Sequence, residues 1–538
     1  MKKWSAIILL AGAQFIMILD GTVMNVSIST VVKDLSTSVS AMQAAITFFT
    51  LTMAALMLTG GKLGDLWGRK RAFLIGLAVY GVGSFITSIS PNIHVLMFGW
   101  SLVEGLGAVL VIPAIVALVA AEYQGRDRVS AFAIIGATAG AAAAAGPLIG
   151  GFVTTYFSWR YVFASESIIV IIILLLWKLI PDEPKDDTGN KLDFPSVILS
   201  AGGMVLLVFG ILQSKVWGWI TPLAKPELFG TAIAPFGISI VIYLIFIGLM
   251  LLIWFMSHQR ELIRKGRDPL LDITVLKIPQ LRSGLGVLMS QNLIIGASFF
   301  VMPIYLQMII GLDALQTGMR IFPLSVSLIL FSIIGSRLIS SFTPKQIVKF
   351  GQWALIIGVA VIATTIDPEL KSLPLLTGMF VLGAGLGLLA SQLGNINLGS
   401  VDKRHSSEVG GMQGTAQNLG QSLGTAIVGS ILIMSLTTGF TASITSSNNV
   451  PANVKSDISA QSTKGIPVVP LSEVRASLAK ENIPTSQANT IINAYTESQL
   501  NGLKKGLVFL LLLSIASLFM SRNLPDTKIS TISDLKAK

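Results

Sequence analysis

The chain has 538 residues, of which 52% are hydrophobic and only 12% are charged, and its mean hydropathy is +0.75. Soluble domains carry about 25% charged residues, so this composition excludes an ordinary soluble protein. The absence of cysteine excludes disulfides, thiolate metal sites and cysteine nucleophiles, and with only three widely spaced histidines no metal site is expected.

Apolar stretches bounded by charged residues or by Pro/Gly clusters predict fourteen membrane-spanning helices. One crossing takes about 20 helical residues, and lipid tolerates no unpaired backbone groups. The stretches fall approximately at 5–30, 41–60, 72–90, 93–120, 130–153, 161–180, 195–214, 230–256, 284–310, 316–341, 346–366, 372–397, 409–436 and 504–521. Small residues at 11–13 imitate a signal-peptide cleavage site, but the apolar run continues to Leu19, so we interpret it as the first span.

The distribution of basic residues predicts the orientation of these spans. If they alternate in direction, 26 of the 38 Lys and Arg residues fall on the side of the N-terminus and 11 on the other side. Because cytoplasmic loops carry the excess of Lys and Arg, we predict that both termini are cytoplasmic and that the number of spans is even. The formal charge of +11 is then a feature of the topology, and no nucleic-acid partner is expected.

Two of the connections are long. Residues 181–193 form an acidic linker that we place in the cytoplasm, and residues 437–503 form an external loop rich in Ser, Thr, Asn and Gln. Within that loop, apolar residues recur at helical spacing over 471–482 and 485–503, which predicts one or two short surface helices. Neither connection carries a catalytic signature.

The tight loop between the second and third spans has the most specific pattern in the chain. Gly61 and Gly68 allow a sharp turn and a close approach of helices. Asp65 can accept hydrogen bonds from a neighbouring helix N-terminus, while Arg69 and Lys70 can pair with acids on a facing loop. We expect this loop to act as a latch that holds one packing of two half-bundles and opens in the other.

The fifth span contains a second pattern of small residues, which includes Gly140, Gly146, Gly150 and Gly151. Small side chains permit close packing between membrane helices, and Pro147 is expected to bend the helix and to free a backbone carbonyl.

These two segments resemble the signature loop and the antiporter motif of the major facilitator superfamily. The segment from Leu19 to Val26 in the first span, Trp159-Arg160 before the sixth, and Pro303 to Gln307 in the ninth are similar to motifs of one branch of it. That branch is the fourteen-span drug:proton antiporters, the QacA- and EmrB-like group. The resemblance covers nearly the whole chain apart from the loop 437–503 and the last dozen residues.

The resemblance implies an all-α membrane protein in which two extra helices separate two six-helix halves. The first half would span 1–180, and 181–282 would hold the linker, the two inserted helices and a cytoplasmic connection. The second half would span 283–522 with its external loop at 437–503, and 523–538 would be a cytoplasmic tail.

The resemblance also implies a secondary active exporter in the bacterial inner membrane. Such a protein works by alternating access, takes its energy from the proton gradient and needs no cofactor. Its partners would be protons, a small-molecule substrate and the lipid bilayer, and it would act as a monomer.

Two positions depart from the pattern of this branch. Its fourth span usually carries Arg, two further residues and then Gln-Gly, whereas this chain has Ser101 at the Arg position and Glu104 before Gly105. In the sixth span, Glu166 replaces an Asn. The usual assignment of a proton relay therefore cannot be copied onto this chain.

Asp20, Glu104 and Glu166 are acids at apparent membrane depth in the first half. Charges within a membrane are costly, so they are rare and usually functional. We expect at least one of the three to be the protonation site, and the resemblance favours Asp20; the others could hold a second proton or face a cationic substrate. The alternative is that an acid lies at the interface, where Glu166 could pair with Arg160 near the outer surface.

Arg320 in the tenth span is the base of the second half that looks buried, and Tyr305 and Gln307 precede it in the ninth. These three residues are a possible second-half site. Arg320 could bind an anionic substrate, or its side chain could simply reach the outer surface.

The leading interpretation is a proton-coupled exporter of amphipathic, cationic compounds, and the alternative within transport is export or flipping of a lipid, fatty acid or other metabolite. A membrane enzyme would need a catalytic constellation, and the sequence has no phosphate-binding loop and no metalloprotease or hydrolase motif. The run Gly383 to Gly387 only imitates a dinucleotide loop, because no strand precedes it. We therefore predict that the chain is not an enzyme.

Overall fold

The computed structural model describes residues 2–123, 125–181, 192–222, 226–228, 231–232, 234–267, 269–401, 406–447, 450, 455–456, 458, 466–481 and 483–526. Most of the predicted acidic linker (182–191) and of the predicted cytoplasmic tail (527–538) lies outside these residues.

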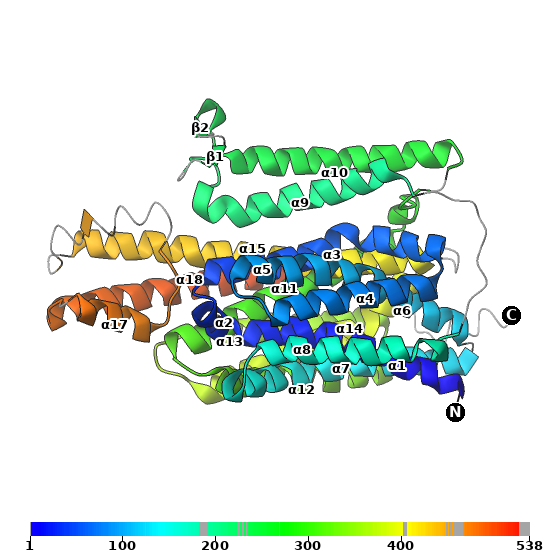
Figure 1. The fold of residues 1–538 in the computed structure, drawn as a ribbon, viewed down its shortest axis with the longest axis horizontal. Helices are drawn as coiled ribbons and strands as arrows, with labels where there is room; N and C mark the ends of the chain where they lie inside the picture. Colours follow the sequence, from blue (N-terminus) through cyan, green and yellow to red (C-terminus); the bar gives the residue numbers. More distant parts are fainter. Residues whose placement is uncertain are drawn as a thin grey trace.

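Each of the fourteen predicted spans overlaps a helix or a run of consecutive helices (Figure 1). They are α1 (Lys2–Val26), α3 (Val39–Trp67), α4 (Arg69–Ser88), η1 with α6 (Met97–Glu104 and Gly105–Glu122), α7 (Gly125–Tyr156), α8 (Arg160–Leu175), α9 (Phe194–Trp217), α10 (Ile240–Arg264), α11 with η5 (Pro279–Ile304 and Tyr305–Ile309), α12 (Ala314–Leu338), α13 (Pro344–Thr365), α14 (Ser372–Gly399), α15 (Ser406–Ser446) and α18 (Thr485–Met520). The shorter elements are α2 (Ile28–Asp34), α5 (Ile93–Leu96), η2 (Trp177–Leu179), η3 (Pro235–Gly237), η4 (Val275–Lys277), α17 (Leu471–Lys480) and η7 (Ser521–Asn523).

Not all of these helices are long enough to cross a membrane by themselves. Within the described residues, 12 helices have the required length and hydropathy, and the count rises to 13 if the bent α7 is one span. Helix α8 has only 16 residues, which is shorter than the roughly 20 of one crossing. The all-helical membrane fold is therefore present, while the count of fourteen spans and the cytoplasmic side of the termini stay predictions.

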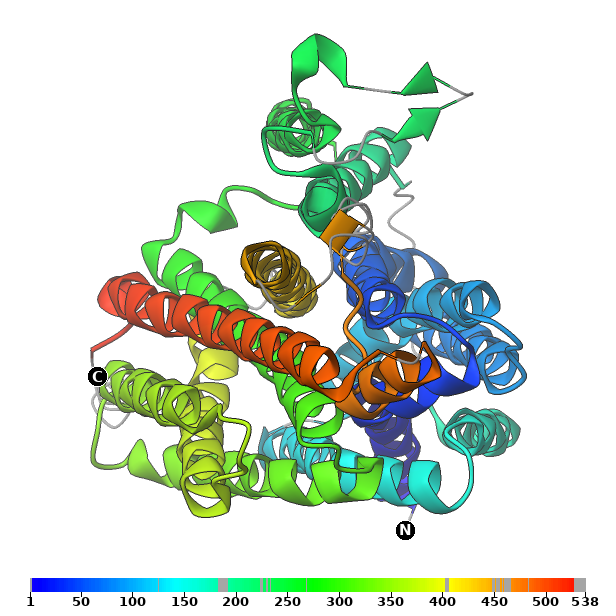
Figure 2. The same cartoon turned by 90° about the vertical axis from the view of Figure 1, so that its left-hand side faces the viewer.

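The long helices form two groups that meet along two seams. Helices α1, α3, α4, α6, α7 and α8 pack among themselves, and so do α11 to α15 and α18. The groups meet where α7 packs on α12 and where α3 packs on α15. The hairpin of α9 and α10 lies to one side, at the top of Figures 1 and 2, where α9 touches both α3 and α15.

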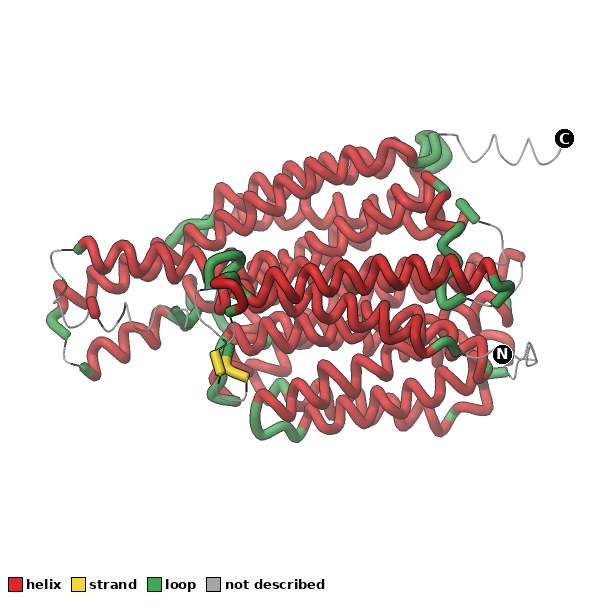
Figure 3. Tube along the Cα trace, turned by 90° about the horizontal axis from the view of Figure 1, so that it is seen from above, coloured by secondary structure: helices red, strands yellow, loops and turns green. Residues whose placement is uncertain are grey.

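The helices on either side of the predicted external loop 437–503 extend into it. Helix α15 continues to Ser446, and α18 starts at Thr485 and runs without a break into the last span, so both helices project beyond the bundle (Figure 3). In the projection, Phe440 packs edge-on against Tyr495 with the ring centroids 5.7 Å apart, and both residues belong to the hydrophobic core that continues through the bundle. The expected helices at 471–482 and 485–503 are present as α17 and as the first part of α18.

The connection between α9 and α10 also differs from the prediction. This connection contains a two-stranded antiparallel hairpin of β1 (Glu227–Leu228) and β2 (Thr231–Ala232), in which Glu227 lies opposite Ala232. Helix α10 begins only at Ile240, about ten residues after the predicted start, because Pro235 and Gly237, which has a φ of +71°, interrupt the helical backbone. Figure 3 shows the two strands in yellow at this connection.

At the opposite end of the helical hairpin of α9 and α10, Asp193 forms hydrogen bonds to both helices. Its carboxylate caps α9 by accepting the backbone N–H of Ser196 at 2.9 Å, and it lies 2.9 Å from Nε2 of His258 on α10. Burial alone would raise the pKa of Asp193, but the hydrogen bonds from Ser196 and His258 outweigh it and lower that pKa.

We expect Asp193→Ala to destabilise the folded protein by about 1–2 kcal/mol at neutral pH, because it removes the helix cap. A carboxyl whose pKa is lowered in the folded state stabilises that state above its unfolded pKa of about 3.9, and the stabilisation is lost as the pH falls through the folded pKa. The difference between wild type and variant in thermal unfolding, followed by tryptophan fluorescence, should therefore shrink below about pH 4. An unchanged unfolding temperature at pH 7 would contradict the cap.

Candidate functional site

Three helices of the first group bring their acids to one point. Asp20 lies on α1, Glu104 ends the π-helical turn η1, and Glu166 lies on α8. All three side chains are fully buried, and one carboxylate oxygen from each lies within 4.8 Å of the other two. We call Asp20, Glu104 and Glu166 the acid cluster.

Asp20 is the member of the acid cluster with a close hydrogen-bond donor. Nε1 of Trp100 lies 2.8 Å from one carboxylate oxygen of Asp20 and 2.9 Å from the other, so a single N–H is shared between both oxygens. The indole is in turn stacked on Phe49 of α3, with the ring centroids 4.9 Å apart and the planes 12° from parallel. The donor is therefore held in place by packing as well as by its own hydrogen bond.

The two glutamates are less well satisfied. Glu166 accepts long hydrogen bonds from the hydroxyls of Tyr80 (3.5 Å) and Ser84 (3.4 Å), both on α4. Its other oxygen and both oxygens of Glu104 have no hydrogen-bond partner among the described residues. A buried carboxylate without partners is costly, so Glu104 is the member that most needs a proton or another positive group.

Charge repulsion also indicates that the acid cluster as a whole needs protons or another positive group. Two carboxylates 4.8 Å apart repel each other by about 3 kcal/mol at an effective dielectric constant of about 20. Within the described part of the chain, no Lys, Arg or His pairs with any of the three acids. The spacing would also suit a metal ion, but both oxygens of Asp20 already face an N–H, which favours protons as the neutralising species.

Close helix packing explains how acids so far apart in the sequence can meet. A methyl group at Gly83 of α4 would lie only 2.5 Å from the backbone nitrogen of Glu104, and one at Gly81 would press on Val170 of α8. These glycines allow α4 to approach both neighbours. The π-helical geometry of Met97–Glu104, which often marks functional sites, places Glu104 at the end of its turn.

Arg160 does not neutralise Glu166, so that alternative is wrong. The guanidinium of Arg160 pairs with Asp34 of α2 and donates to the backbone oxygen of Ser90 at 2.8 Å. Asp34 also accepts the indole N–H of Trp159 at 3.0 Å. Arg160 thus joins three connections at the end of the bundle, away from the acid cluster.

The segment predicted as a latch loop is helical except at Gly68: Gly61 and Asp65 lie in α3, Arg69 and Lys70 begin α4, and Gly68 makes the turn between the two helices. Gly68 has a φ of +90°, which favours glycine, and Gly61 lies against Pro113 of α6. Nε of Arg69 lies 3.9 Å from Asp65, and its Nη1 donates to the backbone oxygen of Ala117 of α6 at 3.4 Å. The ammonium of Lys70 lies 4.8 Å from the centre of the Trp177 ring, beyond the end of α8. The loop therefore joins α3 and α4 to α6 and to η2.

The small residues of α7 face both groups of helices. Gly146 and Gly150 lie directly against Thr22 and Val23 of α1, within the first group. Toward the second group, Gly140 lies against Ile329 of α12, and Gly151 lies against the backbone at Ala314. Helix α7 therefore packs closely on both sides.

Pro147 accounts for the bend in α7. The helix bends by 41° between its parts Ile134–Ala143 and Ala145–Tyr156. Proline cannot donate to the carbonyl four residues earlier, and that carbonyl, at Ala143, instead accepts the hydroxyl of Ser325 of α12 at 3.1 Å. The carbonyl that the proline leaves free is therefore used at the seam between the two groups.

The residues of the possible second-half site turn to different neighbours. The hydroxyl of Tyr305 donates to the backbone oxygen of Asp367 at 2.9 Å, at the end of α13. Gln307 instead crosses to the first group, where its amide donates to the backbone oxygen of Val26 at 2.7 Å and accepts from the N–H of Ser29 at 3.2 Å. Arg320 is half-buried on α12. Gln307 is therefore a contact between the groups.

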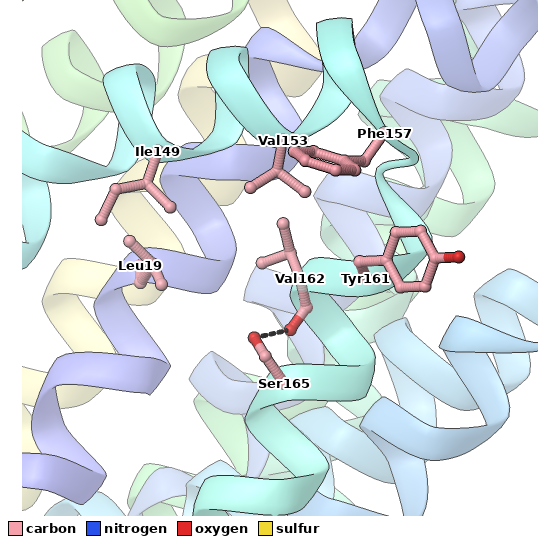
Figure 4. A pocket seen from close by; sticks show the side chains of 7 residues that line it. All are labelled: Leu19, Ile149, Val153, Phe157, Tyr161, Val162 and Ser165. Carbon is pink, nitrogen blue, oxygen red and sulfur yellow. Dashed lines mark hydrogen bonds between the residues drawn. The ribbon is translucent and has the colours of Figure 1, made fainter.

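A separate pocket of about 340 Å³ opens between α1, α7 and α8 (Figure 4). Its lining is Leu19, Ile149, Val153, Phe157, Tyr161, Val162 and Ser165. The hydroxyl of Ser165 donates a hydrogen bond to the backbone oxygen of Val162 at 2.7 Å. Because this bond satisfies the hydroxyl, the walls that the pocket offers to a ligand are mostly apolar. Leu19 and Ser165 directly precede Asp20 and Glu166, but those acids are not among the lining residues.

Sequence reasoning overlooked Trp100, Tyr80 and Ser84. A signal was available, because Trp100 lies four residues before Glu104, and Tyr80 and Ser84 are also four apart. Residues four apart share a helix face, and polar groups on the inner face of a membrane helix need partners.

Comparison with known proteins identifies relatives of the chain. The model of the Major Facilitator Superfamily matches residues 10–425. The "Probable actinorhodin transporter" of Streptomyces coelicolor is 28% identical over 425 residues, which cover 78% of this chain and 70% of that one. The "Tetracenomycin C resistance and export protein" of Streptomyces glaucescens is 25% identical over 421 residues, which cover 78% and 72%.

A solved structure supports the same fold. The inward-facing, unoccupied structure of a bacterial homologue of the human lysosomal transporter Spinster has a TM-score of 0.59 to this chain and is 13% identical, covering 97% of both chains. At this identity the likeness concerns the fold alone.

Proposed function

The chain belongs to the Major Facilitator Superfamily, which consists of transporters rather than enzymes, and we propose that it exports amphipathic, cationic compounds in exchange for protons. The observation that carries this proposal is the acid cluster, in which three buried carboxyls share one space without a basic partner among the described residues. The relative named for tetracenomycin C resistance and export supports the direction of transport.

The chemistry of exchange follows from the charge of the cluster. Protons neutralise the carboxyls when the site is empty, and a cation that approaches from the cytoplasm lowers the free energy of the ionised form, so that a proton leaves. A proton that enters from the outside then restores the neutral cluster and releases the cation. Obligatory exchange results because the cluster cannot remain highly charged in a low-dielectric environment.

The two seams between the helix groups support alternating access. Rocking of one group against the other would open and close the contacts of α7 with α12 and of α3 with α15. In the arrangement described here, the hydrogen bond from Gln307 of η5 to the backbone oxygen of Val26 adds a further contact between the groups, at the end of α1.

The remaining assignments rest on the sequence and on the family. We place fourteen spans in a bacterial inner membrane, with both termini cytoplasmic and α9 and α10 as the inserted helices between the halves 1–180 and 283–522. The proton gradient is the energy source, no cofactor takes part, and the transporter acts as a monomer. We propose that the latch loop controls the conformational change and that Arg320 controls which charge of the substrate is preferred.

Export or flipping of a lipid or fatty acid is the second candidate. The observation that favours it is the apolar pocket between α1, α7 and α8, which offers an acyl chain a lateral site with almost no polar atoms (Figure 4).

Proton release tests the two candidates directly. Proteoliposomes with an acidified interior and an internal pH-quenched dye would be given ethidium or another lipophilic cation. Proton antiport predicts immediate dequenching that depends on the cation and is abolished by a protonophore. If no cation produces dequenching from protein shown to be folded by its tryptophan fluorescence, proton antiport of cations is wrong, and lipid or anionic metabolite export takes its place.

A further inference from the structure

We propose that Trp100 is a positioning residue that holds Asp20 ready to ionise and so sets the pH at which the acid cluster exchanges its proton. This inference rests on the proposed function, because it concerns the same cluster. It adds a residue that neither the family motifs nor the search for membrane-embedded acids selects.

The geometry favours the ionised form of Asp20. The N–H of Trp100 lies at nearly equal distances, 2.8 and 2.9 Å, from the two oxygens of Asp20. An N–H can only donate, so it stabilises a carboxylate more than a carboxylic acid, whose hydroxyl is a poorer acceptor. Hydrogen bonds to charged groups are also stronger in a buried site than in water.

The position of the indole is fixed independently of Asp20. Trp100 is 1% exposed and stacks on Phe49 of α3, and the neighbouring Ser101 donates to the backbone oxygen of Ala45 of the same helix at 2.8 Å. The donor comes from η1 and its acceptor from α1, so the hydrogen bond joins two helices. Movement of η1 relative to α1 would break it, and proton release would thereby depend on conformation.

The other titratable groups around Asp20 have no donor as close as that of Trp100, since the hydrogen bonds that Glu166 accepts from Tyr80 and Ser84 are 3.5 and 3.4 Å long. Those that face it are Glu104 at the end of η1, Glu166 of α8 and Tyr80 of α4. The remaining elements packed on α1 are α2, α6, α7, α11, α12 and η2, and within the described residues they bring no charged side chain into contact with Asp20. Trp100 therefore determines that Asp20 is the acid that loses its proton when the cluster exchanges one, while Glu104 and Glu166 keep theirs.

The test removes the N–H and keeps the ring. In Trp100→Phe, and in a variant with the isosteric benzothienylalanine at position 100, Asp20 should hold its proton to higher pH by about one to two pH units. The readout is the carboxyl band in pH-difference infrared spectra of the full-length protein in lipid, assigned to Asp20 by its loss in Asp20→Asn. Trp254→Phe, on α10 with a 62% exposed side chain, is the matched control.

A midpoint that rises in both position-100 variants but not in Trp254→Phe supports the proposal. An unchanged midpoint in the benzothienylalanine variant overturns it, and this variant decides the matter if Trp100→Phe fails to fold. Because the infrared readout needs no substrate, it can succeed even if no cation drives proton release. Failure of the proposed function and failure of this inference are thus distinguishable.

Discussion

Asp20→Asn should abolish cation-driven proton release from proteoliposomes while the protein remains folded. The amide has nearly the shape of the carboxyl, and its oxygen can still accept the N–H of Trp100. It cannot gain or lose a proton, however, so the exchange of proton for cation has no titratable group at this position. Removal of one of three neighbouring acids should also relieve a repulsion of about 3 kcal/mol whenever a second acid is ionised, so the unfolding temperature should stay the same or rise.

Asp34→Asn is the matched control for this experiment. Asp34 lies on the neighbouring α2, pairs with Arg160 and is partly exposed, so its loss changes the charge of the first group without touching the acid cluster. We expect this variant to keep its proton release. Normal coupling in Asp20→Asn would refute the assignment of Asp20, and loss of coupling in Glu104→Gln alone would transfer that role to Glu104, the acid whose two oxygens have no partner among the described residues.

The sequence was sufficient to select each acid of the cluster but not to show that they meet. Each stood out because an ionisable group within an apolar span is costly, and this argument treats residues singly. Gly81 and Gly83 allow α4 to approach α8 and η1, which carry Glu166 and Glu104, and a single sequence does not indicate which glycines face which helices. Arg160 shows the same limit, since its nearest acid in the sequence, Glu166, is not its partner.

The fold was predictable to a similar extent. Long apolar runs located the helices because hydropathy alone determines where a chain crosses lipid. Helices α15 and α18 extend beyond the apolar runs, where side-chain packing such as that of Phe440 on Tyr495 sustains a polar helix. Helix α10 starts later than predicted because Pro235 and Gly237 interrupt the helical backbone. Trp100 was overlooked because a tryptophan in an apolar span looks like packing until its N–H is seen to face an acid.

Gly318→Ala should impair transport by preventing close contact between α7 and α12. A methyl group at this position would collide with the backbone oxygen of Pro147. The bend of α7 is held against α12 by the hydrogen bond from Ser325, two turns further along α12, to the carbonyl of Ala143, so that α7 cannot move away from the added methyl group. Overpacking of this kind costs about 1–3 kcal/mol, and if the cost falls on only one of two conformations, it shifts their ratio by about 5–150-fold.

Because the chain has no cysteine, spin labels at Tyr156→Cys and Met319→Cys, both exposed, can report the distance across this seam. We expect longer distances between the two labels in Gly318→Ala. The control is Gly136→Ala, where a methyl group meets nothing within 4 Å, and its label distances should match those of the wild type. If both variants have the wild-type distance distribution and transport rate, the seam between α7 and α12 does not take part in the conformational change, and alternating access would have to depend on α3 and α15 alone.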